Sequence, residues 1–243
     1  MTYIINPYRY APAGGGGPAV FPDDVADLLY WLKADAGTFS DAGSTTATAD
    51  GTVFQWNDQS GNGNHFTRLG AGQEPVLKMN IINGLPVLRF DASNDGMQRG
   101  SLSVGIPLTA FIVYCGRTLT GGHRALAGGN NWLIGPYSGQ HAFFGGGGFV
   151  ANTDATVTAD VFVAAVAWQP AVSTASFFVN TVDKTDASGN GTGGPGTAGV
   201  GAANPFGEAL DGDIAEIFVY DRALSAGEID DLHDYLQFRY ALW

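Results

Sequence analysis

The sequence predicts an all-β fold, a sandwich of two antiparallel sheets with one C-terminal helix. Three observations predict it. Glycine supplies 36 of the 243 residues, which indicates many turns and therefore many short strands. Charged residues make up only 14%, against about 25% in typical domains, so the charged faces of long surface helices are largely missing. The apolar runs are short, and clusters of Gly, Asn and Pro separate them.

The elements follow in order along the chain. Pro22 opens a short helical turn that Asp23 or Asp24 caps. The runs 31–35, 53–56 and 85–91 are then expected to be strands. Further apolar runs predict strands at 108–115, 124–126, 132–134, 142–144, 161–168, 176–182 and 214–220. The glycine-rich stretch 187–204 is expected to be a long surface loop.

The last element is an amphipathic helix. Ser225 is predicted to cap it, with Glu228 completing a capping box. Apolar residues at helical spacing mark the face that packs on the sandwich: Ile229, Leu232, Leu236 and Tyr240. Residues off this stripe are expected to face water: Asp230, Asp231, His233 and Asp234.

The charge balance excludes several classes of partner. The net charge is −12 and the isoelectric point about 4.4, so the surface repels both nucleic acid and anionic membrane. Cys115 is the only cysteine, which rules out an intrachain disulfide and predicts a buried core residue. The first residues lack signal-peptide features, and no apolar run approaches the roughly 18 residues of a membrane span.

Four short motifs, which follow one another along the chain, resemble those of one family of β-sandwich proteins. They are Trp31–Asp35, Trp56–Asn64, Asn83–Asp91, and Gly212–Ile217 followed by Tyr220–Ser225. The chain is similar here to concanavalin A-like lectin/laminin G-like jelly rolls. The resemblance implies a two-sheet antiparallel jelly roll over residues 21–243. It leaves function open, because the family includes lectins, adhesive modules, glycosidases and virion proteins.

Residues 1–20 are predicted to form an N-terminal anchoring arm. Tyr3, Tyr8 and Tyr10 precede the glycine run Gly14–Gly17, which indicates a hinge. Tyrosines beside a hinge suit docking onto a partner surface; a disordered tail is the alternative. The opening also resembles those of tailed-bacteriophage structural proteins. This likeness implies a virion location after synthesis in a host cytoplasm, with other virion proteins and further copies of this chain as partners.

One loop carries a candidate calcium site. Asp58, Ser60, Asn62 and Asn64 place oxygen-bearing side chains at every second position, as in the first half of a calcium loop. Leu69 stands where an EF-hand needs a bidentate glutamate, so a Ca²⁺ site here would need ligands from elsewhere. The alternative is a tight Asx-type turn that fixes the loop.

A second cluster is a candidate platform for a glycan. The aromatic residues Trp132, Tyr137, Phe143 and Phe144, with Phe149 nearby, gather around glycine-rich turns. Sugar rings stack on aromatic side chains, so we expect a ligand-binding surface here. The alternative is that these side chains belong to the core.

An acidic run at the start of the last strand is a candidate source of catalytic carboxylates. Asp211, Asp213 and Glu216 resemble the Glu-x-Asp-x-x-Glu motif of one glycosidase family of this fold, with a shorter first residue. Retaining hydrolysis needs two carboxyls about 5–5.5 Å apart. In a regular strand Asp213 and Glu216 point to opposite faces, and only a bulge brings them together. We therefore expect no catalytic residues.

These observations predict a non-enzymatic virion structural protein, a capsid decoration or tail-associated subunit, whose lectin-like sandwich binds host glycans. Two alternatives remain open. One is a glycan-binding adhesion module, and the other is a glycoside hydrolase of the same fold.

Overall fold

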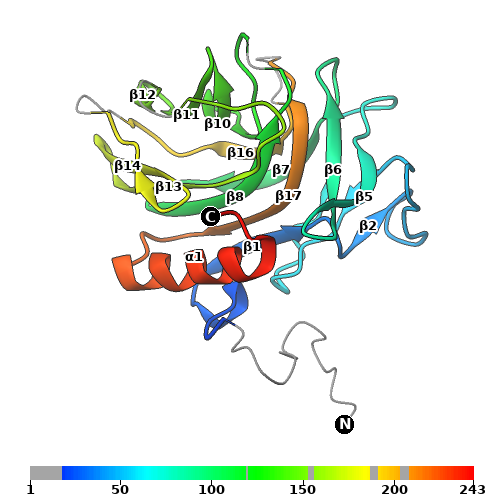
Figure 1. Ribbon diagram of the computed structural model, residues 1–243, viewed down its shortest axis with the longest axis horizontal. Helices are drawn as coiled ribbons and strands as arrows, with labels where there is room; N and C mark the ends of the chain where they lie inside the picture. Colours follow the sequence, from blue (N-terminus) through cyan, green and yellow to red (C-terminus); the bar gives the residue numbers. More distant parts are fainter. Residues whose placement is uncertain (1–17, 119, 153–155, 187–190, 203–207) are drawn as a thin grey trace.

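Two antiparallel sheets lie face to face, and a single helix covers the outer face of one of them (Figure 1). The computed structural model describes residues 18–118, 120–152, 156–186, 191–202 and 208–243. The predicted all-β sandwich with one C-terminal helix is therefore confirmed. Among the residues so described, no helix has the length and apolarity needed to cross a membrane.

The first sheet, called sheet A, has eight strands within the described ranges. In spatial order these are β15 (Val182–Asp183), β14 (Thr174–Val179), β13 (Val163–Ala171), β8 (Leu108–Gly116), β17 (Asp211–Tyr220), β6 (Leu85–Asp91) and β5 (Val76–Ile82). The remaining strand, β1 (Leu28–Lys33), pairs with the second half of β17, beside the part that pairs with β6. Strand β17 therefore lies at the centre of the sheet and contacts three neighbours.

The second sheet, called sheet B, has nine strands in the part of the chain that the structure describes. Their spatial order is β12 (Phe149–Ala151), β11 (Gln140–Gly145), β10 (Trp132–Tyr137), β9 (Leu126–Gly128), β16 (Gly196–Val200), β7 (Met97–Val104), β4 (Phe66–Arg68), β3 (Gln55–Trp56) and β2 (Thr38–Phe39).

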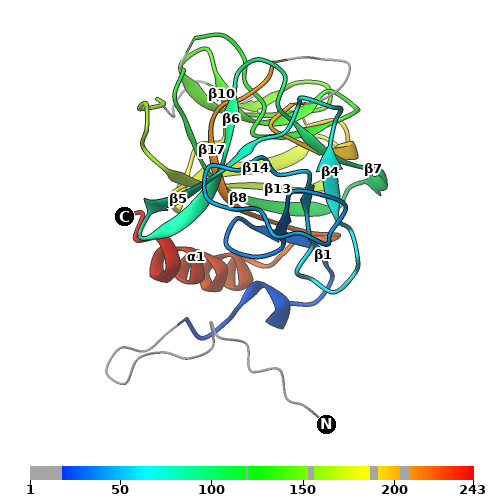
Figure 2. The same cartoon turned by 90° about the vertical axis from the view of Figure 1, so that its right-hand side faces the viewer.

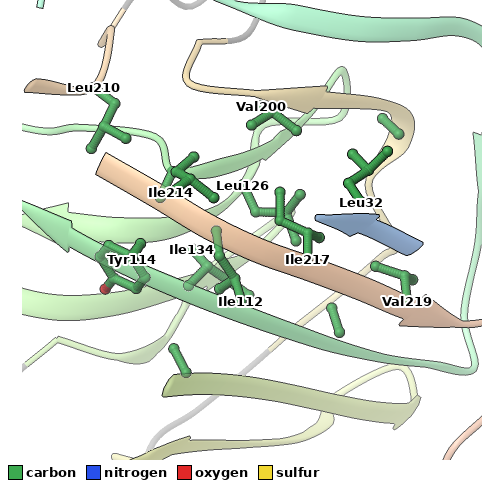
Figure 3. Close-up of a cluster of buried hydrophobic side chains, with 14 of the residues drawn as sticks. Leu32, Ile112, Tyr114, Leu126, Ile134, Val200, Leu210, Ile214, Ile217 and Val219 are labelled. Carbon is green, nitrogen blue, oxygen red and sulfur yellow. The ribbon is translucent and has the colours of Figure 1, made fainter. Parts of the chain in front are cut away.

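The main core fills the space between the two sheets. Figure 3 shows Ile112 and Ile217 of sheet A near Leu126, Ile134 and Val200 of sheet B. These side chains are almost completely buried. Burying an aliphatic side chain of this size contributes about 1.5–3 kcal/mol, so the sandwich depends on apolar packing, and its one cysteine forms no disulfide.

A second apolar cluster lies between sheet A and helix α1 (Ala226–Tyr240). Figure 2 shows α1 and the segment before β1, which includes the 3-10 turn η2 (Pro22–Asp24), on the same side of the sheet. The predicted start of the helix is confirmed. Ser225 Oγ accepts from the Glu228 backbone N–H, and the Glu228 carboxylate accepts from the Ser225 backbone N–H.

His233 was expected to face water, and that prediction is wrong. Its side chain is buried between α1 and sheet A, with Phe111 and Trp243 edge-to-face against it at 6.0 Å. Burial lowers the pKa of this imidazole. The apolar stripe of α1 is therefore wider than the residues at strict helical spacing indicated.

The glycine-rich stretch 187–204 was expected to be a surface loop, but Gly196–Val200 within it form strand β16 in the middle of sheet B. Close approach of backbones explains the composition. A Cβ on Gly194, within the stretch, would lie 2.5 Å from the Gly105 backbone, and one on Gly128 of the neighbouring strand β9 would lie 2.3 Å from the Pro195 carbonyl oxygen. Glycine here indicates tight strand packing, which the sequence pattern alone does not distinguish from a loop.

Candidate functional site

Three half-buried aromatic side chains form a ridge on the outer side of sheet B. Tyr137 ends β10, Phe144 lies on β11 and Phe149 on β12. The Phe149 ring centroid lies 5.1 Å from those of both other residues, at interplanar angles of 61° to Tyr137 and 85° to Phe144. We call these three residues the aromatic ridge.

A tight hairpin positions the ridge. Ser138 and Gly139 join β10 to β11 in two residues, both with positive φ (50° and 81°), as the twist of a two-residue hairpin favours. The turn pairs Tyr137 with Gln140 across the strands. Gln140 Oε1 is buried beside this turn and has no hydrogen-bond partner in the described residues.

The loop before β9 supports the ridge from one side. Arg124, almost completely buried, donates to Glu208 Oε2 at 2.7 Å and to Asn131 Oδ1 at 2.6 Å. A Cβ on Gly122 would lie 2.6 Å from a carbon of the Tyr137 ring, so the absence of a side chain there lets the loop reach the ring. Charge-assisted hydrogen bonds of this kind hold a loop more firmly than neutral ones.

The predicted platform is corrected at two of its four positions. Trp132 and Phe143 have no exposed surface, and their rings contact each other at 5.1 Å within the inter-sheet core. Strand alternation explains the error, because Trp132 and Tyr137 point to opposite faces of the same strand. Tyr137 and Phe144 remain on the outer face, where Phe149 joins them.

The Asp58 loop has the geometry of an Asx-type turn. Asp58 Oδ1 accepts from the backbone N–H groups of Trp31 and Ser60, both at 2.9 Å. Its Oδ2 accepts from the Ser60 hydroxyl at 2.8 Å and the Asn64 N–H at 2.9 Å. Asn62 and Asn64 direct their amide N–H groups at backbone carbonyls of β1.

These residues do not fit the predicted calcium site. Ca²⁺ binds through oxygen lone pairs, and four donors already use those of the only carboxylate in the loop. Across the described residues, no group of three or more His, Cys, Asp or Glu side chains is placed to hold a metal. The loop instead fastens the Asp58 turn to strand β1.

The acidic run of β17 contains the bulge that its catalytic interpretation required. The register of β17 against β8 shifts between Ile214 and Glu216. Ile214 and Ile217 both face the inter-sheet core, so the two residues between them lie on the opposite face. Asp213 and Glu216 therefore share the outer face of sheet A, and the expectation of a regular strand with opposed carboxylates is wrong.

Asp213 and its neighbour Asp211 are nevertheless bound to other side chains. Asp213 accepts two hydrogen bonds from Arg89, both at 2.7 Å, and these bonds raise the pKa of the guanidinium. Asp211 accepts from the Thr118 hydroxyl and lies 3.2 Å from an Arg117 nitrogen. Asp213 is 2% exposed, so little of it is available to a substrate.

Glu216 has no exposed surface and lies beneath α1. Its Oε1 accepts from Trp31 Nε1 at 2.5 Å and from the Tyr235 hydroxyl at 2.7 Å. Its Oε2 accepts from the Tyr240 hydroxyl at 2.6 Å and from Arg239 Nε at 2.9 Å. Burial, reinforced by this carboxylate, raises the pKa of both tyrosines well above the ordinary value. The arrangement is that of a structural anchor between helix and sheet.

The remaining residues that the sequence singled out either lie outside the described residues or are buried away from the aromatic ridge. Tyr3, Tyr8 and Tyr10 lie outside the described residues. Cys115 is buried as expected, and burial, followed by the charge of Asp213, raises the pKa of its thiol to about 12. A thiol with so high a pKa is a poor nucleophile at neutral pH.

A family model described as the concanavalin A-like lectin/glucanases superfamily matches residues 109–230, just over half of the chain. The chain belongs to this superfamily. The match runs from β8 into α1, so it includes both the aromatic ridge and the β17 acidic run of this concanavalin A-like domain.

Solved structures share the fold at low sequence identity. Domain 4 of AbnA, a GH43 extracellular arabinanase from Geobacillus stearothermophilus, in complex with arabinotriose, is 15% identical with a TM-score of 0.61, over 85% of this chain and 98% of that one. The binding domain of Paraclostridial mosquitocidal protein 1 is 12% identical with a TM-score of 0.58. That match covers 88% of this concanavalin A-like domain and 52% of the toxin chain. No curated protein matches the sequence.

Sequence reasoning missed the residues that support the ridge in this concanavalin A-like domain. Glu208 and Arg124 are 84 positions apart, and no local pattern links them. Gln140 had a detectable signal, because it directly follows the Ser-Gly pair of a two-residue hairpin that begins at an aromatic residue.

Proposed function

We propose that this chain is a non-enzymatic attachment protein that binds carbohydrate through the aromatic ridge. The observation that carries the proposal is the group of three half-buried rings on the outer side of sheet B. Ligand sites combine aromatic surface with a few polar groups that set orientation.

The carboxylates of β17 support a binding role over hydrolysis. A retaining glycosidase needs two carboxyls that reach both sides of one glycosidic bond. Glu216 is fully buried with four donors, and Asp213 is paired with Arg89. Neither group has the exposure that such chemistry requires.

Two structural neighbours agree with a binding role. One is the arabinanase domain in complex with arabinotriose, and the other is named as the binding domain of a toxin. Their low identity limits the comparison to the fold, so the ligand must be found by experiment.

A carbohydrate panel that includes arabinotriose tests the ridge directly. We expect Phe149→Ala to weaken binding of the full chain about tenfold or more, equivalent to about 1.4 kcal/mol, because Phe149 contacts both other rings. Phe238→Ala is the matched control, since it removes an exposed ring from α1 on sheet A. Equal loss in both variants, or no binding to any carbohydrate, contradicts the proposal.

We further propose that the protein is a structural component of a tailed-phage virion, held by residues 1–20 to other virion proteins and assembled as a homo-oligomer. The likeness of the opening residues to phage structural proteins supports this, together with an arm of three tyrosines before a glycine hinge. Deletion of residues 1–20 is expected to abolish incorporation into particles while the sandwich still folds. Normal incorporation of the deletion variant would reject the anchoring role of residues 1–20.

A further inference from the structure

A groove of about 290 Å³ lies between α1, the hairpin that joins β5 to β6, and the segment before β1. Tyr235 and Phe21 line it, with ring centroids 5.6 Å apart, and Leu85 adds aliphatic surface. Phe238, also in the lining, is 51% exposed. Figure 2 shows the segment before β1 and α1 side by side beneath sheet A. It is distant from the aromatic ridge of sheet B.

The polar groups of the groove are already engaged, with one exception. The Arg239 guanidinium contacts Glu216 and Asp35, and the Tyr235 hydroxyl donates to Glu216. Asn83 Nδ2 donates to the Arg239 carbonyl at 2.9 Å. No described group donates to Asn83 Oδ1. The groove therefore presents apolar ring surface beside a side-chain acceptor that has no described donor, which fits an aromatic ring that carries a hydroxyl.

The chain itself supplies such a ring close by. Pro18, the first described residue, lines the groove, so residues 1–17 leave from its wall. This segment holds three tyrosines and a single charged side chain, Arg9. Solvated tails are typically rich in charge and poor in aromatics, and this composition is the opposite. We propose that in the free protein, before any partner takes up the arm, the segment Tyr8–Tyr10 of the same chain docks in this groove, with a tyrosine hydroxyl donated to Asn83 Oδ1.

The volume of the groove and the length of the linker both suit the segment Tyr8–Tyr10 as the occupant. A volume of about 290 Å³ is near the lower end of small-ligand pockets, about 300–1,000 Å³, which suits one aromatic side chain and its backbone. Gly14–Gly17 lie between Tyr10 and Pro18 and permit the chain to reverse direction. A short flexible connection also gives the segment a millimolar effective concentration at the groove. Docking within one chain is therefore favoured over exchange with a second copy.

Trypsin provides the test, because Arg9 is the only basic side chain in residues 1–17. Docking protects the bond between Arg9 and Tyr10. We expect the full chain to be cleaved there about tenfold more slowly than a synthetic peptide of residues 1–17, since cleavage follows the population of the undocked state. Phe238→Ser should raise the rate of the full chain to that of the peptide. Val172→Ser, at a residue 58% exposed on the β13–β14 turn, is the matched control and should remain protected.

Two results would overturn the proposal. Equal cleavage rates for the full chain and the peptide would show that the segment does not dock. Protection that disappears on dilution of the protein would show docking between copies instead of within one chain. Phe238 is exposed, so its substitution tests docking without removing a core residue. The outcome does not depend on whether the ridge binds carbohydrate.

Discussion

Glu216→Gln tests whether this residue is a structural anchor or a catalytic group. The substitution preserves the shape of the side chain and removes its charge. It removes the charge that faces Arg239 from β17 while the pair of Arg239 with Asp35 stays, and it places an amide N–H₂ among groups that all donate to this side chain. Removing one member of a buried ion pair costs about 3–5 kcal/mol.

This loss is large enough to measure by thermal unfolding. A change of 1 kcal/mol shifts the Tm of a domain of this size by about 2–4 °C, so we expect Glu216→Gln to lower the Tm by about 6–20 °C. Circular dichroism follows the transition, and α1 should separate from sheet A first. Asp221→Asn, an exposed position directly after β17, removes the same charge and should leave the Tm unchanged.

The opposite result would refute the reasoning. Active-site carboxylates are held for chemistry, and replacing one usually costs little stability or even raises it. A Glu216→Gln variant as stable as Asp221→Asn would therefore contradict the anchor. It would also reopen a catalytic role for the β17 acidic run.

Two further predictions concern buried acids. Burial, reinforced by Asp91, raises the pKa of Asp95 to about 6 from 3.8, so its contribution to stability is present below the unfolded value and is lost as the pH rises through about 6. Urea unfolding should show Asp95→Asn gaining stability relative to the wild type from pH 4 to pH 7, and a pH-independent difference would contradict this assignment. Asp58→Asn should cost about 1–3 kcal/mol through its unpaired donors, while Ca²⁺ and EGTA leave the wild-type Tm unchanged. A Tm that rises with Ca²⁺ only in the wild type would restore the metal site.

The sequence was sufficient to predict the elements with strong local patterns. The capping box at Ser225 and the run 85–91 are confirmed at the predicted positions, because hydrophobic periodicity and caps depend on neighbours in the chain. Strands β7 and β16 were missed. Most of their residues are small or polar, and they form strands because other strands pair with them on both sides.

The candidate site was predictable only in part, for a related reason. Composition placed aromatic residues around the β10–β12 turns, but the face on which each side chain lies depends on strand register. Tyr137 therefore lies in the aromatic ridge, whereas Trp132 lies in the core. The bulge in β17 was likewise invisible, because it arises from pairing with β8 that no local pattern reveals. Asp58 showed the right spacing for a metal, yet the backbone donors of β1 decided its role.

Backbone amide chemical-shift mapping, with the best-binding oligosaccharide titrated into the full chain, tests the central claim most directly. If the ridge is the binding surface, the shifts will be confined to Tyr137, Gln140, Phe144, Phe149 and their neighbours on the outer side of sheet B. Shifts centred on Arg89, Asp213 and the strands beside them would contradict it, because they would place the sugar over the β17 carboxylates.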